Sequence, residues 1–194
     1  MHERLIDYIG RQLAYPLNPE DVEVIRRIFR PRKLRRHQYF LQQGHVCTEA
    51  GFVVSGALKQ YSVDESGKEN ILTLYIEDWW ASDRESFNSG TPSNYCIDVV
   101  EEAELLVITK EDAVKHLNLR PFTADLMRVL SERQAMQLLK RVHATNTMTA
   151  EQRLADLEKT YPAFLQRFPQ HIIASYLGMT KETLSRIRAA GLKK

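Results

Sequence analysis

Three polar residues near the end of the chain, Glu182, Ser185 and Arg186, have types and a spacing that suit contact with DNA bases. With Ala189 they follow the i, i+3, i+4, i+7 pattern, so they share one face if the segment is a helix. An arginine can bridge the O6 and N7 acceptors of guanine, and a glutamate can accept from the N4 amino group of cytosine. The pattern therefore indicates a helical face that could project into a major groove.

Two short helices joined by a tight turn would position this face. The first is predicted at residues 170–177 and ends at Gly178, which can adopt the left-handed conformation of a helix C-cap. Thr180 can cap the second helix, and Leu184 and Ile187 would anchor that helix on a core. An amphipathic hairpin with a merely solvated polar face is the alternative. Because glycine, cap and apolar anchors agree at fixed offsets, the sequence predicts a helix-turn-helix.

The charge distribution favours the same end of the chain for a contact with phosphates. The net charge is only +2, but residues 37–112 contain fourteen acidic against four basic residues, which makes that region a poor DNA face. Residues 26–36 contain seven basic residues and no acid, and we interpret them as a solvated surface rather than as a phosphate- or partner-binding patch. Phosphate contacts are expected from four residues beside the base-reading face: Lys181, Arg188, Lys193 and Lys194.

Composition is that of an ordinary globular protein, with 194 residues, 43% hydrophobic and 27% charged. No apolar run is long enough for a signal peptide or a membrane helix, so we expect a cytoplasmic protein without a membrane partner. The two cysteines, Cys47 and Cys96, are too few for a disulfide framework or a four-thiolate cluster. We therefore expect reduced, buried thiols and no cofactor.

Before the C-terminal unit, the pattern predicts helices, then strands, then helices again. Helices are expected at residues 3–14 and from Pro19, where Asn18 provides a capping side chain. Between residues 33 and 110, short strands alternate with turn residues at a spacing typical of a β-roll or jelly roll. We expect strands at residues 38–41, 51–54, 57–63, 70–76, 95–100 and 104–109, followed by a short helix at 111–117.

A long helix is predicted from Pro121 to about His143. An apolar stripe runs along it over about five turns, formed by Leu126, Val129, Leu130, Met136, Leu139 and Val142. A long helix between two compact units is a natural dimer seam. The alternative is that the stripe packs against the chain's own β-domain.

This order of elements resembles the Crp/Fnr family of bacterial transcription regulators (cyclic-AMP receptor and fumarate-nitrate regulator) over roughly residues 20–190. The resemblance rests on the glycine-bearing segments 38–44, 51–56 and 64–68 and on residues 178–187, which look like the family's recognition helix. The trio Glu182, Ser185 and Arg186 resembles the fumarate-nitrate branch.

The resemblance implies an α+β homodimer that binds a pseudo-palindromic operator in double-stranded DNA. Its parts would be a cyclic-nucleotide-binding-like β-roll that senses a signal (1–120), a dimerisation helix (121–148) and a helix-turn-helix DNA-binding domain (149–194). A small effector of unknown identity and RNA polymerase are the further partners that the family implies.

Two departures from the family pattern bear on mechanism. Ala81-Ser82-Asp83 stands where cyclic-nucleotide binders carry a Gly-Glu pair, and Ser93-Asn94 stands where they carry an arginine and a small hydroxyl residue. Without that arginine a cyclic phosphate loses its charge-assisted partner, so we predict no tight binding of cyclic AMP. The chain also stops at Lys194, where family members continue into a β-hairpin wing. Side chains that could still line a ligand pocket are Trp79, Trp80, Asp83, Arg84, Asn94 and Tyr95.

Enzyme chemistry is not predicted. A metalloenzyme built on a similar β-roll needs a His-x-His pair with further ligands, whereas the six histidines are scattered singly, and no catalytic cluster can be assembled from the spacings. The stronger rival is a β-roll that senses a small ligand or binds a protein, with a helix-turn-helix that does not read DNA.

Overall fold

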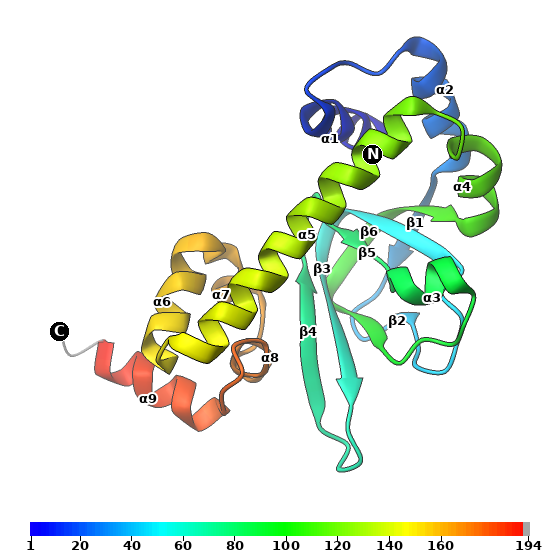
Figure 1. The fold of residues 1–194 in the computed structure, drawn as a ribbon. Coiled ribbons are helices and arrows are strands. Elements are labelled where there is room, and N and C mark those ends of the chain that lie inside the picture. Colours follow the sequence, from blue (N-terminus) through cyan, green and yellow to red (C-terminus); the bar gives the residue numbers. More distant parts are fainter. Residues whose placement is uncertain (192–194) are drawn as a thin grey trace.

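The computed structural model describes residues 1–191, which form a β-roll flanked by two groups of helices (Figure 1). The chain begins with α1 (His2–Leu13) and α2 (Pro19–Ile28). As the sequence predicts, Asn18 caps α2: its side-chain oxygen accepts the backbone N–H of Asp21 at 2.7 Å. Residues 1–191 contain no helix that is both long and apolar enough to cross a membrane.

One antiparallel sheet carries the strands in the order β1-β6-β3-β4, with β2 paired to β6 and β5 paired to β3. Apolar side chains from these strands pack against one another and fill the interior of the roll. The strands are β1 (Arg30–Leu34), β2 (Tyr39–Leu41), β3 (Glu49–Val63), β4 (Glu69–Tyr75), β5 (Trp80–Ala81) and β6 (Cys96–Thr109).

In two places, a pair of strands that the sequence predicts as separate forms one continuous strand. Segments 51–54 and 57–63 both lie in β3, and the two predicted strands after residue 95 both lie in β6. Gly56 bends β3 without ending it: its φ is +94°, and a Cβ there would lie 2.3 Å from the carbonyl oxygen of Glu102. The β3–β6 register shifts on both sides of this glycine. The signal taken for a turn is therefore a bulge inside a long, curved strand.

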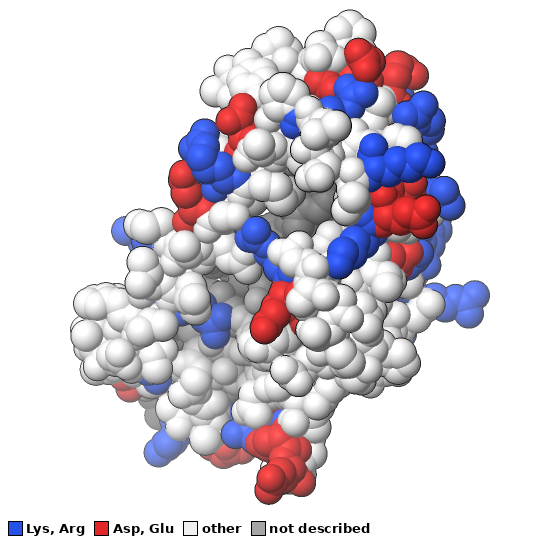
Figure 2. Space-filling model, turned by 45° about the vertical axis from the view of Figure 1, so that its right-hand side comes forward, with Lys and Arg blue, Asp and Glu red and all other residues white. Residues whose placement is uncertain are grey.

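Part of the basic segment 26–36 is paired with acidic neighbours. Arg26 lies 2.7 Å from Glu3, and Arg32 lies 2.5 Å from Glu49. Figure 2 shows basic and acidic side chains intermixed over the upper part of the face that it draws. This arrangement supports the interpretation of the segment as a solvated, ion-paired surface.

Helices α3 (Arg84–Ser89) and α4 (Lys110–Leu117) precede the long α5 (Pro121–Thr147), whose apolar stripe divides into two halves. Leu126 is 4% exposed and packs with α1, α2 and the sheet. Met136, Leu139 and Val142, by contrast, are 57%, 63% and 50% exposed. Leu126 therefore holds α5 on its own β-domain and is not free for a partner, which corrects the continuous stripe predicted from the sequence.

After α5 the chain forms four short helices, α6 (Ala150–Thr160), α7 (Pro162–Arg167), α8 (Gln170–Tyr176) and α9 (Lys181–Gly191). They do not form a free lobe. Their buried side chains share one hydrophobic cluster with β3, β4 and β6. The helix-turn-helix consequently packs against the β-roll.

Candidate nucleic-acid interface

The turn between α8 and α9 has the geometry that the sequence predicts. Gly178 has φ +65°, in the left-handed region, and the N–H of Met179 donates to the carbonyl of Ala174 at 2.9 Å. The hydroxyl of Thr180 accepts the N–H of Thr183 at 3.2 Å and so caps α9. The turn therefore holds the two helices in one fixed relation.

Buried anchors hold α9 on the rest of the unit. Ile173, Ala174 and Leu184 are each 1% exposed, and Ile187 packs against the same cluster from the edge. The small side chain of Ala174 lets α8 and α9 cross closely. With these residues turned inward, the opposite side of α9 is left to solvent.

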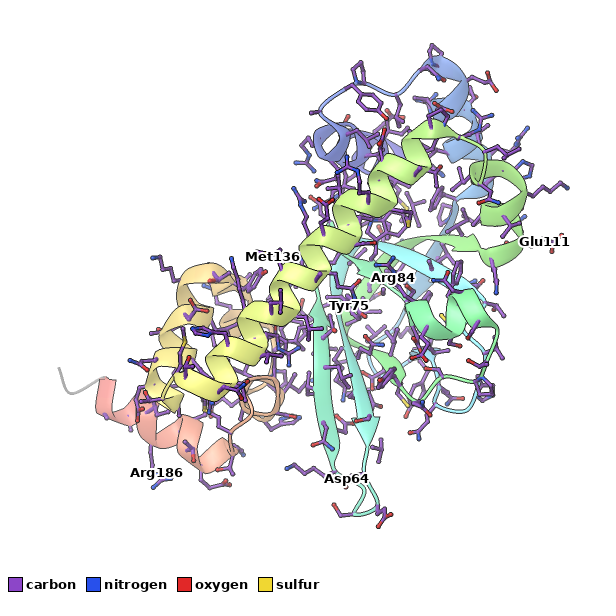
Figure 3. All side chains as sticks on the ribbon, in the orientation of Figure 1. Asp64, Tyr75, Arg84, Glu111, Met136 and Arg186 are labelled. Atoms are coloured by element: carbon purple, nitrogen blue, oxygen red, sulfur yellow. The ribbon has the colours of Figure 1, made fainter. Side chains whose placement is uncertain are left out.

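The outward side of α9 carries the residues predicted to read bases. Glu182, Ser185, Arg186 and Ala189 are all exposed. Figure 3 shows Arg186 on the side of α9 that points away from the β-roll, and its guanidinium makes one 3.3 Å contact with the hydroxyl of Thr183. A single neutral contact leaves most of the arginine's donors available to a ligand.

Basic side chains lie beside this face. Lys181 and Arg188 are exposed, one at each end of the helix. Lys193 and Lys194 lie outside the described residues. Hydrogen bonds to the backbone N–H of Glu182 itself and to the Thr180 hydroxyl lower the pKa of the Glu182 carboxyl, so this residue is an ionised acceptor at neutral pH.

A different arrangement is found at α3, where the altered cassette lies. Asp83 is 6% exposed, and one carboxylate oxygen accepts the N–H groups of Glu85 and Ser86 at 3.1 and 3.4 Å. The other oxygen accepts the hydroxyl proton of Ser93 at 2.6 Å. N–H groups at the start of a helix are the groups that commonly bind phosphate. Here a carboxylate of the chain already occupies them, and the two altered positions are bonded to each other.

The six residues proposed as a pocket lining do not converge. Trp79 packs on Tyr161 with ring centroids 5.7 Å apart, toward the C-terminal helices, whereas Trp80 packs on Phe52 at 5.3 Å, toward α1 and α2. Asp83 is turned inward, Asn94 is exposed and Tyr95 is half-buried.

Arg84, the remaining member, points to α5 (Figure 3). Its guanidinium donates to the side chains of Gln134 and Ser131, both at 2.9 Å. Deeper in the roll, Tyr75 is 4% exposed and donates to Gln60 at 2.7 Å, and burial raises the pKa of its phenol. The interior of the roll is thus filled by its own side chains.

Comparisons with known proteins agree with this architecture. Residues 31–118 match the family model of the cyclic nucleotide-binding domain. The anaerobic regulatory protein of Haemophilus influenzae is 25% identical over 195 residues, covering 90% of this chain and 72% of its own length. The transcriptional activator protein Anr of Pseudomonas protegens is 26% identical over 193 residues, covering 90% and 76%. The chain therefore resembles regulators of the Crp/Fnr family over most of its length.

A solved structure supports the fold independently. A Crp/Fnr-family regulator from Eubacterium rectale superposes with a TM-score of 0.70 at 16% identity, covering 91% of this chain and 85% of that one. At that identity the likeness shows the fold alone. The two curated relatives are named as regulatory proteins. Within residues 1–191 of the present structure, no group of three or more His, Cys, Asp or Glu residues is placed to hold a metal ion.

Sequence reasoning missed one set of residues, those that join the helix-turn-helix to the β-roll. Ser175 on α8 contacts the backbone of β4, and Arg141 on α5 contacts both β4 and α8. Neither residue stands out by type or spacing. A lone serine in a short helix and one arginine among many carry no local signal of such a contact.

Proposed function

We propose that this protein is a transcription regulator that binds DNA sequence-specifically as a homodimer and does not respond to cyclic AMP. The observation that carries the proposal is the exposed face of α9, where Glu182, Ser185 and Arg186 lie together on a helix whose opposite side is anchored. Arginine suits guanine and glutamate suits cytosine on the major-groove edge. Lys181 and Arg188 would contact phosphates, as would Lys193 and Lys194 beyond the described residues.

The proposed division of labour follows the elements. Residues 1–120 would form the sensory domain, 121–148 the dimerisation helix and 149–194 the DNA-binding domain. The capping box at Thr149, which begins α6, supports the last boundary. The shared hydrophobic cluster means that the first and last parts would act as one body in each protomer.

A second copy of the chain is the proposed partner of α5. Its C-terminal half exposes four apolar side chains, whereas an isolated surface helix would normally carry polar residues there. They are Met136, Leu138, Leu139 and Val142, between 50% and 63% exposed. Pairing of two such helices would bury these side chains and bring two copies of α9 to the same face of a duplex.

The lack of response to cyclic AMP rests on Asp83. A cyclic phosphate entering the cassette would meet a buried carboxylate in place of free N–H groups, and Ser93 instead of an arginine. Like charges repel, and no charge-assisted donor compensates. Calorimetry with cyclic AMP should therefore give no binding at micromolar concentrations, and micromolar binding that disappears in Arg84→Ala would contradict this interpretation.

Selection from a random DNA pool tests the function itself. The wild-type protein should enrich a pseudo-palindrome with half-site centres about one helical turn apart, because two recognition helices related by a dimer axis meet successive major grooves. Lack of enrichment, or a winner without inverted symmetry, would favour the rival in which the helix-turn-helix binds a protein.

Sedimentation tests the dimer separately. The double variant Leu138→Lys, Leu139→Lys should be monomeric, since two charges would enter the proposed seam. Leu119→Lys is the matched control, because Leu119 is 96% exposed and lies outside α5. A double variant that stays dimeric would place the seam elsewhere.

A further inference from the structure

The open edge of the sheet is where the helix-turn-helix is attached. Within residues 1–191, β4 is the last strand in the sheet order, so one side of its backbone has no strand partner there. The Ser175 hydroxyl on α8 accepts the N–H of Ile71 at 3.0 Å and contacts the carbonyl of Glu69 at 3.2 Å. One side chain of the helix-turn-helix therefore satisfies two edge groups of the β-roll.

A bulge in β4 supplies the second attachment. Gln60 pairs with Thr73 and Tyr61 pairs with Ile71, so Leu72 is left without a partner in β3. The carbonyl of Leu72 accepts a hydrogen bond from the guanidinium of Arg141 on α5. The bulge thus provides a backbone acceptor that a regular strand would have used within the sheet.

Arg141 also contacts α8. Its guanidinium lies 4.4 Å from the centroid of the Tyr176 ring, and it donates to the carbonyl of Tyr176 at 3.5 Å. A single half-buried side chain therefore joins the long helix, the edge of the β-roll and the first helix of the helix-turn-helix. Rotation of α8 and α9 about the end of α5 would break both contacts between Arg141 and Tyr176.

A salt-bridge cluster fixes the other side of the same unit. Arg167 at the end of α7 lies 2.5 Å from Glu77 and 2.7 Å from Glu101. Glu77 in turn accepts the N–H of Gly56 at 2.9 Å. Burial acts to raise the pKa of Glu77, but the hydrogen bond and charge of Arg167, together with the backbone N–H groups of Glu77 and Gly56, hold this pKa below its ordinary value. Glu77 is therefore ionised at neutral pH and pairs with Arg167.

We propose that Arg141 is a positioning residue for DNA recognition: by tying α5 to β4 and α8, it fixes α9 relative to the dimer axis and so sets the half-site spacing. The inference rests on the proposed function. A contact that blocked DNA binding would cover the recognition face, yet Glu182, Ser185 and Arg186 stay exposed while the unit is docked. The docked arrangement therefore leaves the recognition face free to reach DNA.

Binding to operators of different spacing tests the role of Arg141. Each operator carries the selected half-sites with zero, one, two or three base pairs added between them. The wild-type dimer should lose roughly 10²-fold in affinity when the spacing is wrong, because simultaneous engagement of two half-sites is then prevented. Arg141→Gln should discriminate between spacings by less than about tenfold while selecting the same half-site sequence. A loss of mere stability would weaken all spacings alike.

Two further variants complete the design. Lys140→Gln removes the same charge from the neighbouring, exposed position of α5 and should retain the wild-type preference. Arg141→Lys keeps a donor for the Leu72 carbonyl but loses the planar contact with Tyr176, so its discrimination should be intermediate. Wild-type spacing preference in Arg141→Gln would overturn the proposal.

A measurement without DNA keeps the inference separable from the proposed function. Spin labels at Glu111→Cys on α4 and Ala190→Cys on α9 occupy exposed positions, while Cys47 and Cys96 are buried. The distance distribution should be narrow in the wild-type background and in Lys140→Gln, and broad in Arg141→Gln. A narrow distribution in Arg141→Gln would refute the role of Arg141. Failure of the wild-type protein to select any DNA would refute the proposed function, whatever this distribution is.

Discussion

Helices α3 and α9 both begin with a side chain that accepts backbone N–H groups, but the two caps have opposite consequences. At α3 the cap is Asp83, a buried carboxylate bonded to Ser93. At α9 the cap is Thr180, a neutral hydroxyl at the surface. The first helix is closed by the protein's own negative charge, whereas the second presents its outer face to solvent. Two helices of similar local design thus differ in whether a ligand can reach them.

The difference predicts where substitutions act. Changes at the start of α3 should lower the free energy of unfolding, because Asp83, Ser86 and Ser93 are buried and hydrogen-bonded to one another. Changes on the outer face of α9 should lower DNA affinity. They should leave the free energy of unfolding within about 0.5 kcal/mol of the wild-type value, as is usual for exposed positions.

The largest expected effect is that of Asp83→Ala. It removes the acceptor of the buried N–H of Ser86 and of the partly buried N–H of Glu85, and leaves the Ser93 hydroxyl only the longer contact with the Tyr95 carbonyl at 3.2 Å. The free energy of unfolding should therefore fall by about 2–4 kcal/mol. Urea denaturation measures this. Asp83→Asn retains one acceptor oxygen and should lose less. A loss below about 1 kcal/mol for Asp83→Ala would mean that the carboxylate does not hold the cassette.

Arg186→Ala comes next. Removing a bidentate contact with guanine should cost ~1–3 kcal/mol of binding to the best site. Fluorescence anisotropy with a labelled operator measures the loss, and urea denaturation should show unchanged stability. An equal loss on every sequence would mean that Arg186 contacts only the backbone.

Thr180→Ala should cost about 1 kcal/mol of stability, the usual value of a helix N-cap. The loss should be smaller than that of Asp83→Ala, since water can reach the freed N–H of Thr183 at the surface. Equal losses at the two caps would remove the contrast between a closed and an open helix.

The smallest effect is expected for Arg188→Ala. A phosphate contact carries no sequence information, so all DNA sequences should be weakened alike, and the salt dependence of binding should fall by roughly one unit of slope. Affinity titrations between low and moderate salt measure it. A changed consensus in this variant would instead assign Arg188 to base reading.

How far the sequence predicts this structure depends on how local each signal is. The helix-turn-helix is encoded by neighbours: Gly178, Thr180 and Leu184 lie within seven residues of one another. The left-handed Gly178, the Thr180 cap and the buried Leu184 are all confirmed. The strand pattern was less reliable, because the glycine that marks a turn in one context marks a bulge at Gly56. Which of the two occurs depends on pairing with β6, nearly fifty residues away.

Contacts between distant segments could not be predicted at all. Ile71 and Ser175 are separated by 104 positions, and only the docking of α8 on β4 brings them together. The same holds for the bond between Asp83 and Ser93. The sequence shows that both positions depart from the family's cyclic-nucleotide cassette, but it does not show that the two side chains bond to each other.

The most direct test of the central claim is to select DNA separately with the wild-type protein and with Arg186→Ala. If the outer face of α9 reads bases, the wild type should select an inverted repeat, and the variant should lose its preference at one base pair in each half-site while keeping the others. A variant that selects the same consensus as the wild type would contradict the claim.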